Sequence, residues 1–140
     1  MKKLFFLILP SAFISASAFA KIPAKVTDAL EAKYTHATNV EWKYVVGKYE
    51  ADFNMGKYKL EATFDRKGQW LESEKILGKD MLPMSVLNNI KKSKYSHWKI
   101  KSSREMYLPG EKSGYRVMVT KGDFVFRNLK FDHHGQLMNG

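Results

Sequence analysis

The sequence contains no cysteine, which excludes disulfide bonds and thiolate metal sites and leaves packing as the source of stability. Acidic residues are also few, since 14 Asp and Glu stand against 24 Lys and Arg, and the formal net charge is +10. A surface this basic attracts anionic partners, and the attraction weakens as salt is added.

Only one long apolar run is present, at residues 4–20, and it follows the basic start Lys2 and Lys3. This order, with small residues at the end of the run, is typical of a secretory signal peptide that is cleaved after Ala20. The run is short for a membrane-spanning helix and is interrupted by Pro10. We therefore expect a periplasmic or secreted protein with no transmembrane segment in the mature chain.

Loss of Lys2 and Lys3 with the signal peptide would lower the net charge from +10 to +8. Export, and the even spread of lysines along the chain, argue against nucleic acid as a partner. A solvated basic surface is one interpretation of the remaining charge. The alternatives are an acidic exported protein or an anionic membrane surface as partner.

Two parts of the chain share the same ordered series of motifs, which indicates an internal repeat. A proline opens a helical pattern at residues 23–34 and again at residues 83–94. Further on, the segment FDRKGQ at residues 64–69 matches FDHHGQ at residues 131–136. The expected parts are a signal peptide and two repeats, at residues 1–20, 21–78 and 79–140.

Each repeat is predicted to contain one helix followed by four strands. Val40, Trp42, Tyr44 and Val46 alternate with polar residues, which is the period of a half-buried strand. Short turns that contain glycine join the strands, so the sheet should be antiparallel. The strands are expected at residues 40–46, 49–53, 58–64 and 69–75, and at residues 97–107, 115–120, 123–131 and 136–138.

The fold class expected from these elements is α+β. The sheet would have eight strands, or form two four-stranded halves, with both helices on one face. The other face would stay open to water, as antiparallel sheets allow, and a broad open face suits a partner. In the first repeat it would carry Lys43, Glu50, Asp52, Lys57, Lys59 and Glu61.

The last long strand shows a change of parity. Phe124 and Phe126 share one parity, whereas Leu129 and Phe131 share the other. One extra residue that reverses the pleat is a β-bulge, which we predict near residues 127–128.

The duplicated motifs resemble those of the PepSY-like family, also described as β-lactamase-inhibitor-like and found in exported proteins of Bacteroidetes-type bacteria. The resemblance rests on the proline-initiated helix with its Lys-Tyr end, the YEADF strand at residues 49–53 and the Phe-Asp-x-x-Gly-Gln turn. It covers essentially all of residues 22–140. It implies a tandem helix-plus-four-strand fold like that of β-lactamase-inhibitor protein, and a non-enzymatic binding role. No segment matches the contact loops of the longer, disulfide-containing inhibitors, so no binding residue is carried over.

The four histidines give little support for a metal site. His36 and His97 follow the two helices at matching places, which favours a shared structural role such as helix-end capping. His133 and His134 are adjacent in the last turn, but a metal site needs about three or four ligands. We expect no metal and no cofactor.

Glu72 and Glu74 should point to the same face of a strand, as catalytic carboxylate pairs do. Nothing else marks a cleft, so we expect both at a solvated edge. The chain also lacks a nucleophile-elbow motif and a phosphate-binding glycine loop. No catalytic residue is therefore predicted, and the protein is not expected to be an enzyme.

The candidate partner-binding residues are Trp70, Trp98, Arg116 and Met118. Trp70 shares parity with Glu72, so it is either an exposed anchor or packed against the helix of the other repeat. Trp98 is expected at the junction of the repeats. Arg116 and Met118 are expected to line the open face of the second repeat.

Three functions remain open at this point. The first is an exported binding module, an inhibitor or regulator of an envelope or secreted enzyme. The second is a basic structural protein of the envelope that binds anionic surfaces. The third is an enzyme of a type that the sequence does not reveal.

Overall fold

The computed structural model describes residues 21–138. The predicted signal peptide at residues 1–20 lies outside the described residues, as do residues 139–140. In chain order the elements are α1 (Ala24–Lys33), β1 (Thr38–Val45), β2 (Lys48–Met55), β3 (Tyr58–Asp65), β4 (Trp70–Leu77), the short 3₁₀ helix η1 (Lys79–Met81), α2 (Met84–Lys91), β5 (Lys99–Leu108), β6 (Lys112–Lys121) and β7 (Val125–Asp132).

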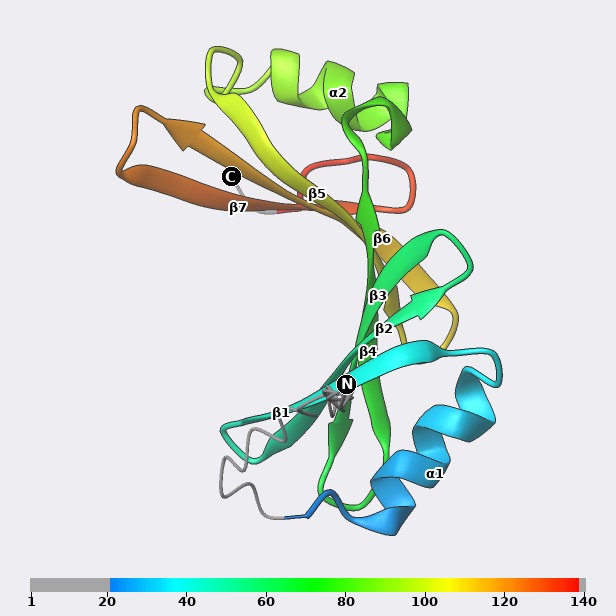
Figure 1. The fold of residues 1–140 in the computed structure, drawn as a ribbon. Helices are drawn as coiled ribbons and strands as arrows, with labels where there is room; N and C mark the ends of the chain where they lie inside the picture. The colour runs from blue at the N-terminus through cyan, green and yellow to red at the C-terminus, as the bar shows by residue number, and fades with distance from the viewer. Residues whose placement is uncertain (1–20, 139–140) are drawn as a thin grey trace, which may run out of the picture.

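The seven strands form one antiparallel sheet in which the order in space follows the order in the chain. The two halves join in a single sheet because β4 pairs with β5, from Ser73 opposite Tyr107 to Leu77 opposite Ser103. Figure 1 shows a strongly twisted sheet with α1 and α2 at opposite ends of the molecule. The α+β class is confirmed. Among residues 21–138, no helix is both long enough and apolar enough to cross a bilayer.

Each helix covers its own hydrophobic cluster. Beneath α1, the sheet surface includes the small, fully buried side chains of Ala51 and Ala62. Beneath α2, it includes the larger buried side chains of Val117 and Leu129. The first cluster consists of Val26, Leu30, Tyr49, Ala51, Phe53, Ala62 and Phe64. The second consists of Leu77, Leu82, Val86, Ile90, Tyr95, Val117, Val119, Leu129 and Phe131.

Two turns lie directly against the starts of the helices. Gly68 and Gly135 both have a φ of +82°, which side chains rarely adopt. A Cβ at Gly68 would lie 2.5 Å from the carbonyl oxygen of Lys25 in α1, and a Cβ at Gly135 would collide with Ser85 in α2. Glycine is therefore required here both for the turn and for the close approach of the helix.

The predicted eighth strand at residues 136–138 is not formed. Leu137 makes a single antiparallel bridge to Phe131, and the Met138 N–H donates to the Lys130 carbonyl at 2.7 Å. These contacts cover part of the β7 edge but do not make a ladder, so the sheet has seven strands rather than eight.

The bulge predicted near residues 127–128 is also wrong. The β6–β7 register runs without a shift from Lys121 opposite Val125 to Gly114 opposite Asp132. The extra residue lies in the turn at residues 122–124, which is one residue longer than the β2–β3 turn at residues 56–57. Lengthening a turn costs little entropy, whereas a bulge disrupts ladder hydrogen bonds.

Strand β1 is less buried than its alternating pattern predicts. Trp42 is half-buried against the first cluster, but Val40 and Tyr44 are exposed, and Val46 in the following turn is 92% exposed. The reason is that β1 is an edge strand and α1 packs mainly over β2 and β3.

Candidate protein-binding face

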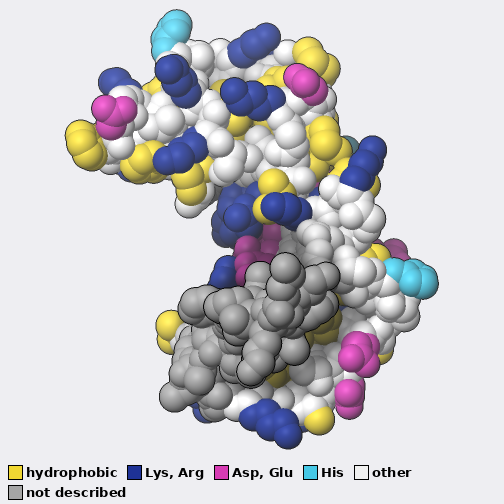
Figure 2. All heavy atoms as spheres, viewed as in Figure 1, with side chains coloured by type: hydrophobic (Ala, Val, Ile, Leu, Met, Phe, Trp, Pro, Cys, Tyr) yellow, Lys and Arg dark blue, Asp and Glu magenta, His cyan; other side chains and the backbone are white. Residues whose placement is uncertain are grey.

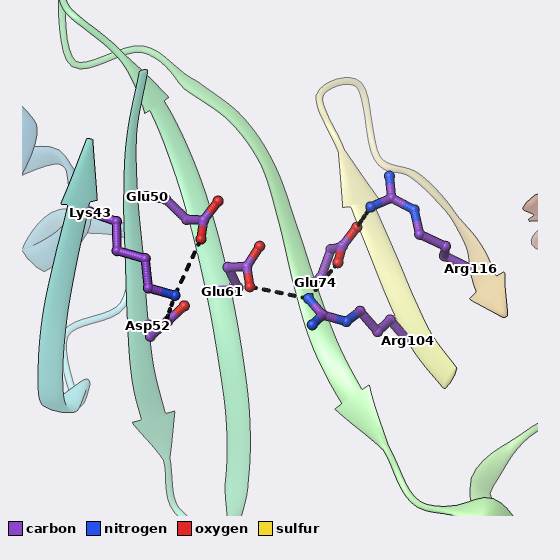
Figure 3. Close-up of polar contacts among 7 residues, drawn as sticks. All are labelled: Lys43, Glu50, Asp52, Glu61, Glu74, Arg104 and Arg116. Carbon is purple, nitrogen blue, oxygen red and sulfur yellow. Dashed lines mark hydrogen bonds and ion pairs between the residues drawn. The ribbon is translucent and has the colours of Figure 1, made fainter. Parts of the chain in front are cut away.

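Charged side chains form a connected row on the open face of the sheet. They alternate along the strands with the buried residues Ala51, Ala62, Ser73, Ser103 and Val117. We call this set the charged row, and Figure 3 shows its seven members: Lys43, Glu50, Asp52, Glu61, Glu74, Arg104 and Arg116.

At the β1 end of the row, one lysine forms ion pairs with two carboxylates. The Lys43 ammonium lies 2.5 Å from Asp52 Oδ2 and 3.7 Å from Glu50 Oε1. Its hydrogen bond to Asp52 raises the pKa of Lys43. Burial, and then repulsion from Glu61, raise the pKa of Glu50 above its usual range.

At the centre of the row, Glu74 is held between two arginines. Arg104 Nη1 donates to Glu74 Oε2 at 2.8 Å and to Glu61 Oε2 at 3.1 Å. Arg116 Nη1 pairs with Glu74 Oε1, which receives no well-aligned hydrogen bond within residues 21–138. Burial alone would lower the pKa of Arg104, but its bonds to the two carboxylates outweigh burial and raise that pKa.

The expectation that Glu72 and Glu74 lie at a solvated edge is wrong for Glu74. Its side chain is only 4% exposed, because β4 occupies the middle of the sheet and its neighbours come from β3 and β5. The pairing of β4 with β5 joins distant parts of the chain, so the alternating pattern of β4 alone could not reveal it.

The pairing register explains why the cations are needed. Asp52 lies directly opposite Glu61, and Glu61 directly opposite Glu74. Like charges at opposed positions destabilise a sheet. Lys43 and Arg104 extend toward this line of three carboxylates from β1 and β5. The pairs that Arg104 makes with Glu61 and Glu74 bridge the β4–β5 seam.

Two hollows open on the charged row and share Glu61 and Arg104. The larger, of about 410 Å³, extends over β1 to β5, and the smaller, of about 250 Å³, extends over β3 to β7. Figure 2 shows basic and acidic side chains together at the narrow waist between the two lobes. Both hollows therefore present charged groups that can donate and accept hydrogen bonds.

Glu50, Asp52 and Glu61 have carboxylate oxygens within 4.8 Å of one another, a spacing that metal ligands also show. Lys43 already pairs with Glu50 and Asp52. A cation would have to compete with that ammonium, so we assign no metal to this cluster.

Arg116 and Met118 lie on the open face, where the sequence places them. Both line the smaller hollow, and Met118 is half-buried there opposite Asn128.

Trp70 lies on the other side of the sheet. A register shift in β4 places Glu72 opposite Thr63 but Trp70 opposite Phe64, so the parity shared by Trp70 and Glu72 is broken. The indole Nε1–H donates to Ser73 Oγ at 2.8 Å, and the Lys33 ammonium lies 3.6 Å from the ring centroid. Trp70 therefore packs against the helix of its own half.

Trp98 packs against the second cluster rather than at the junction of the two halves, and its ring centroid lies 5.1 Å from that of Tyr95. His36 and His97 are exposed and make no hydrogen bond within the described part of the chain, so the structure gives no support for helix capping. The exposed rings of His133 and His134 lie 3.8 Å apart in the last turn.

Two helices on a seven-stranded antiparallel sheet with an open face define a BLIP-like fold. The chain belongs to the family described as "Putative beta-lactamase-inhibitor-like, PepSY-like", whose model matches residues 47–139. The resemblance drawn from the sequence is thereby confirmed.

Several solved structures share the fold. A BLIP-like protein from Bacteroides fragilis is 26% identical, with a TM-score of 0.78 over 89% of each chain. A DUF2874 family protein from Bacteroides uniformis is 26% identical, with a TM-score of 0.77 over 86% of this chain and 88% of that one. A protein from Bacteroides eggerthii described as one of its "putative periplasmic proteins" is 20% identical, with a TM-score of 0.76 over 86% and 88%. No match was found among curated proteins.

Proposed function

We propose that the protein is an exported, non-enzymatic binding module that docks another exported protein on the charged row. The partner would be an envelope or secreted enzyme that this module inhibits or regulates. The observation that carries the proposal is Glu74, whose side chain is 4% exposed at the centre of the open face and is held by Arg104 and Arg116.

A buried ion network contributes little to stability, because apolar side chains of similar size are often as stabilising or more so. Recognition of a partner would explain why a buried ion network is present here. Arginine and methionine are also enriched in protein interfaces, and Arg116 and Met118 lie together in the smaller hollow.

Export is supported by the signal-peptide pattern of residues 1–20 and by the periplasmic description of the Bacteroides eggerthii protein. We place the mature chain in the periplasm or the extracellular medium, starting after Ala20.

We further propose that residues 21–78 and 79–140 are two copies of one unit, with both helices over the same face. The matching turns at Gly68 and Gly135, each packed against a helix start, support the duplication. The register supports the shared face, since it links Ala62 to Ser73, and Leu77 through Ser103 to Val117.

Affinity capture tests the binding role. Residues 21–140 would be immobilised, an envelope and secreted-protein extract passed over them at low and high salt, and retained proteins identified by mass spectrometry. We expect one partner that resists high salt, and β-lactamases and peptidases would be assayed first for inhibition by the pure module.

Two variants show whether the partner uses the charged row. Met118→Arg adds a bulky charge to the smaller hollow, whereas Met84→Arg adds the same group to the exposed start of α2, where Met84 is 63% exposed. The partner should be lost with Met118→Arg and retained with Met84→Arg. Equal retention by both variants, or capture that vanishes at high salt, would contradict the proposal.

A further inference from the structure

The β6–β7 turn carries an apolar group that the protein does not cover. Phe124, at the tip of this three-residue turn, is 92% exposed, and the next two residues, Val125 and Phe126, are 41% and 39% exposed. Contiguous exposed apolar residues of this kind mark a contact site rather than a core. Figure 1 shows that the turn projects from the end of the sheet, away from the waist.

Cations surround this tip on the neighbouring strands. Lys121 lies opposite Val125, and Lys99 lies opposite Thr120, which itself lies opposite Phe126. The Lys101 ammonium lies 4.6 Å from the Phe126 ring, and Arg127 follows in β7. All four basic residues, Lys99, Lys101, Lys121 and Arg127, are exposed.

The surrounding half of the chain has the same sign of charge. Residues 79–140 contain 12 Lys and Arg against 5 Asp and Glu, a net charge of +7, whereas residues 21–78 have a net charge of +1. In the stretch from Val119 to Asn128, Asp123 is the only acidic residue.

We propose that the β6–β7 tip is a docking site for an anionic membrane surface, with Phe124 inserted at the boundary between headgroups and acyl chains. Aromatic rings insert at this depth while cations beside them attract anionic headgroups. The excess of cations around an exposed aromatic ring, with Asp123 as the one acidic residue between Val119 and Asn128, is what favours an anionic bilayer as the occupant. The charged row at the waist stays free, so the site is separate from the proposed protein-binding face.

Vesicle binding tests the site directly. Residues 21–140 would be titrated with vesicles that contain phosphatidylglycerol and, separately, with pure phosphatidylcholine vesicles, at low and high salt. We expect binding to the anionic vesicles, weakened but not abolished by salt. A Phe124→Trp variant should show a blue-shifted emission that brominated lipid quenches, which reports insertion of the ring.

Two variants remove the two components of the site. The triple change Lys99→Gln, Lys101→Gln and Lys121→Gln should weaken binding on the order of 100-fold at low salt, at about fivefold for each cation. Phe124→Ser should weaken it about tenfold and remove the salt-resistant part.

The first half supplies matched controls. Val46→Ser alters an equally exposed turn residue, and Lys48→Gln, Lys57→Gln and Lys67→Gln remove three exposed lysines; both variants should bind as the parent does. The proposal is overturned if the parent protein does not bind anionic vesicles. It is also overturned if Phe124→Ser binds them as tightly as the parent, because charge alone would then account for binding. Phe124-dependent capture of a protein without vesicle binding would equally overturn it.

Discussion

Each half of the molecule contains one α-helix and part of the sheet, but the two halves contribute different side chains to the charged row. Strands β2 to β4 contribute Glu50, Asp52, Glu61 and Glu74, whereas β5 and β6 contribute Arg104 and Arg116. In the proposed repeat, residue 50 and residue 116 occupy equivalent places, since each follows the tyrosine of a Gly-x-Tyr or Gly-Tyr motif. The difference teaches that Glu74 depends on cations from the other half, whereas Glu50 and Asp52 pair with Lys43 of their own half.

The strongest test of this comparison asks whether the halves unfold together. Phe64→Ala empties the first cluster and Phe131→Ala the second, and each should lower the free energy of unfolding by about 4 kcal/mol because both rings are fully buried. Because β4 and β5 join the halves in one sheet, either change should destabilise the whole molecule. Urea unfolding followed by circular dichroism and by fluorescence measures this.

A Trp98→Phe background makes the comparison specific, because the remaining tryptophans, Trp42 and Trp70, both lie in the first half. In that background the fluorescence and circular dichroism transitions should coincide. Two separate transitions would show that the halves are independent and that the β4–β5 seam contributes little.

The next largest effect concerns the seam itself. Glu74→Ala should lower the free energy of unfolding by about 3 kcal/mol, because it leaves Arg104 and Arg116 without their shared carboxylate. The two arginine side chains are 31% and 29% exposed, so water relieves part of the cost. Glu72→Ala, in the same strand, should cost no more than about 0.5 kcal/mol.

Replacing all three charges together separates recognition from stability. A Glu74→Leu, Arg104→Leu, Arg116→Met variant should recover most of the stability that Glu74→Ala loses, yet lose the captured partner. A triple variant that is as unstable as Glu74→Ala would show that the ion network is a structural requirement.

The smallest effect is a pair of pH responses with opposite signs, one in each half. The N–H groups of Gln136 and His134 hold the pKa of Asp132 below its usual range, so its stabilising contribution is present at neutral pH and is lost as pH falls through that lowered pKa. Glu50 has a raised pKa from burial and Glu61, so its carboxylate destabilises the fold at neutral pH, and this cost disappears as pH falls through the raised pKa.

At pH 7, Asp132→Asn should therefore reduce the free energy of unfolding. Glu50→Gln should increase it, by less than about 1 kcal/mol because the site is partly solvated. The Glu50→Gln difference should shrink as pH falls through the raised pKa of Glu50, whereas the Asp132→Asn difference should shrink only at lower pH, as pH falls through the lowered pKa of Asp132. Equal signs at pH 7 would contradict the environments described for the two carboxyls.

Local patterns predicted the helices and hairpins well, because a proline at each helix start and a glycine in each tight turn act within a few residues. They failed where the outcome depended on distant pairing. The burial of Glu74 depends on the β4–β5 contact, and the orientation of Trp70 depends on one irregular step between β3 and β4. In the candidate face, Arg116 and Met118 line the smaller hollow, but the ion pair of Arg116 with Glu74 depends on distant strand pairing and could not be predicted from the sequence.

The parity of Phe124 and Phe126 misled for a different reason. The change of parity between Phe126 and Leu129 predicts one extra residue within the strand, that is, a bulge. The extra residue lies in the turn, and both rings lie outside the core. A sequence pattern cannot distinguish a ring kept for packing from one kept for contact with a partner.

The sheet surfaces beneath the two helices differ in side-chain size, which limits the exchange of sequence between the two halves during evolution. The small side chains of Ala51 and Ala62 leave more room beneath α1, whereas the larger side chains of Val117 and Leu129 leave less room beneath α2. A helix moved from one half to the other would meet either voids or overlaps, both of which cost stability. Exchange of the two helices between the gene segments would thus be selected against.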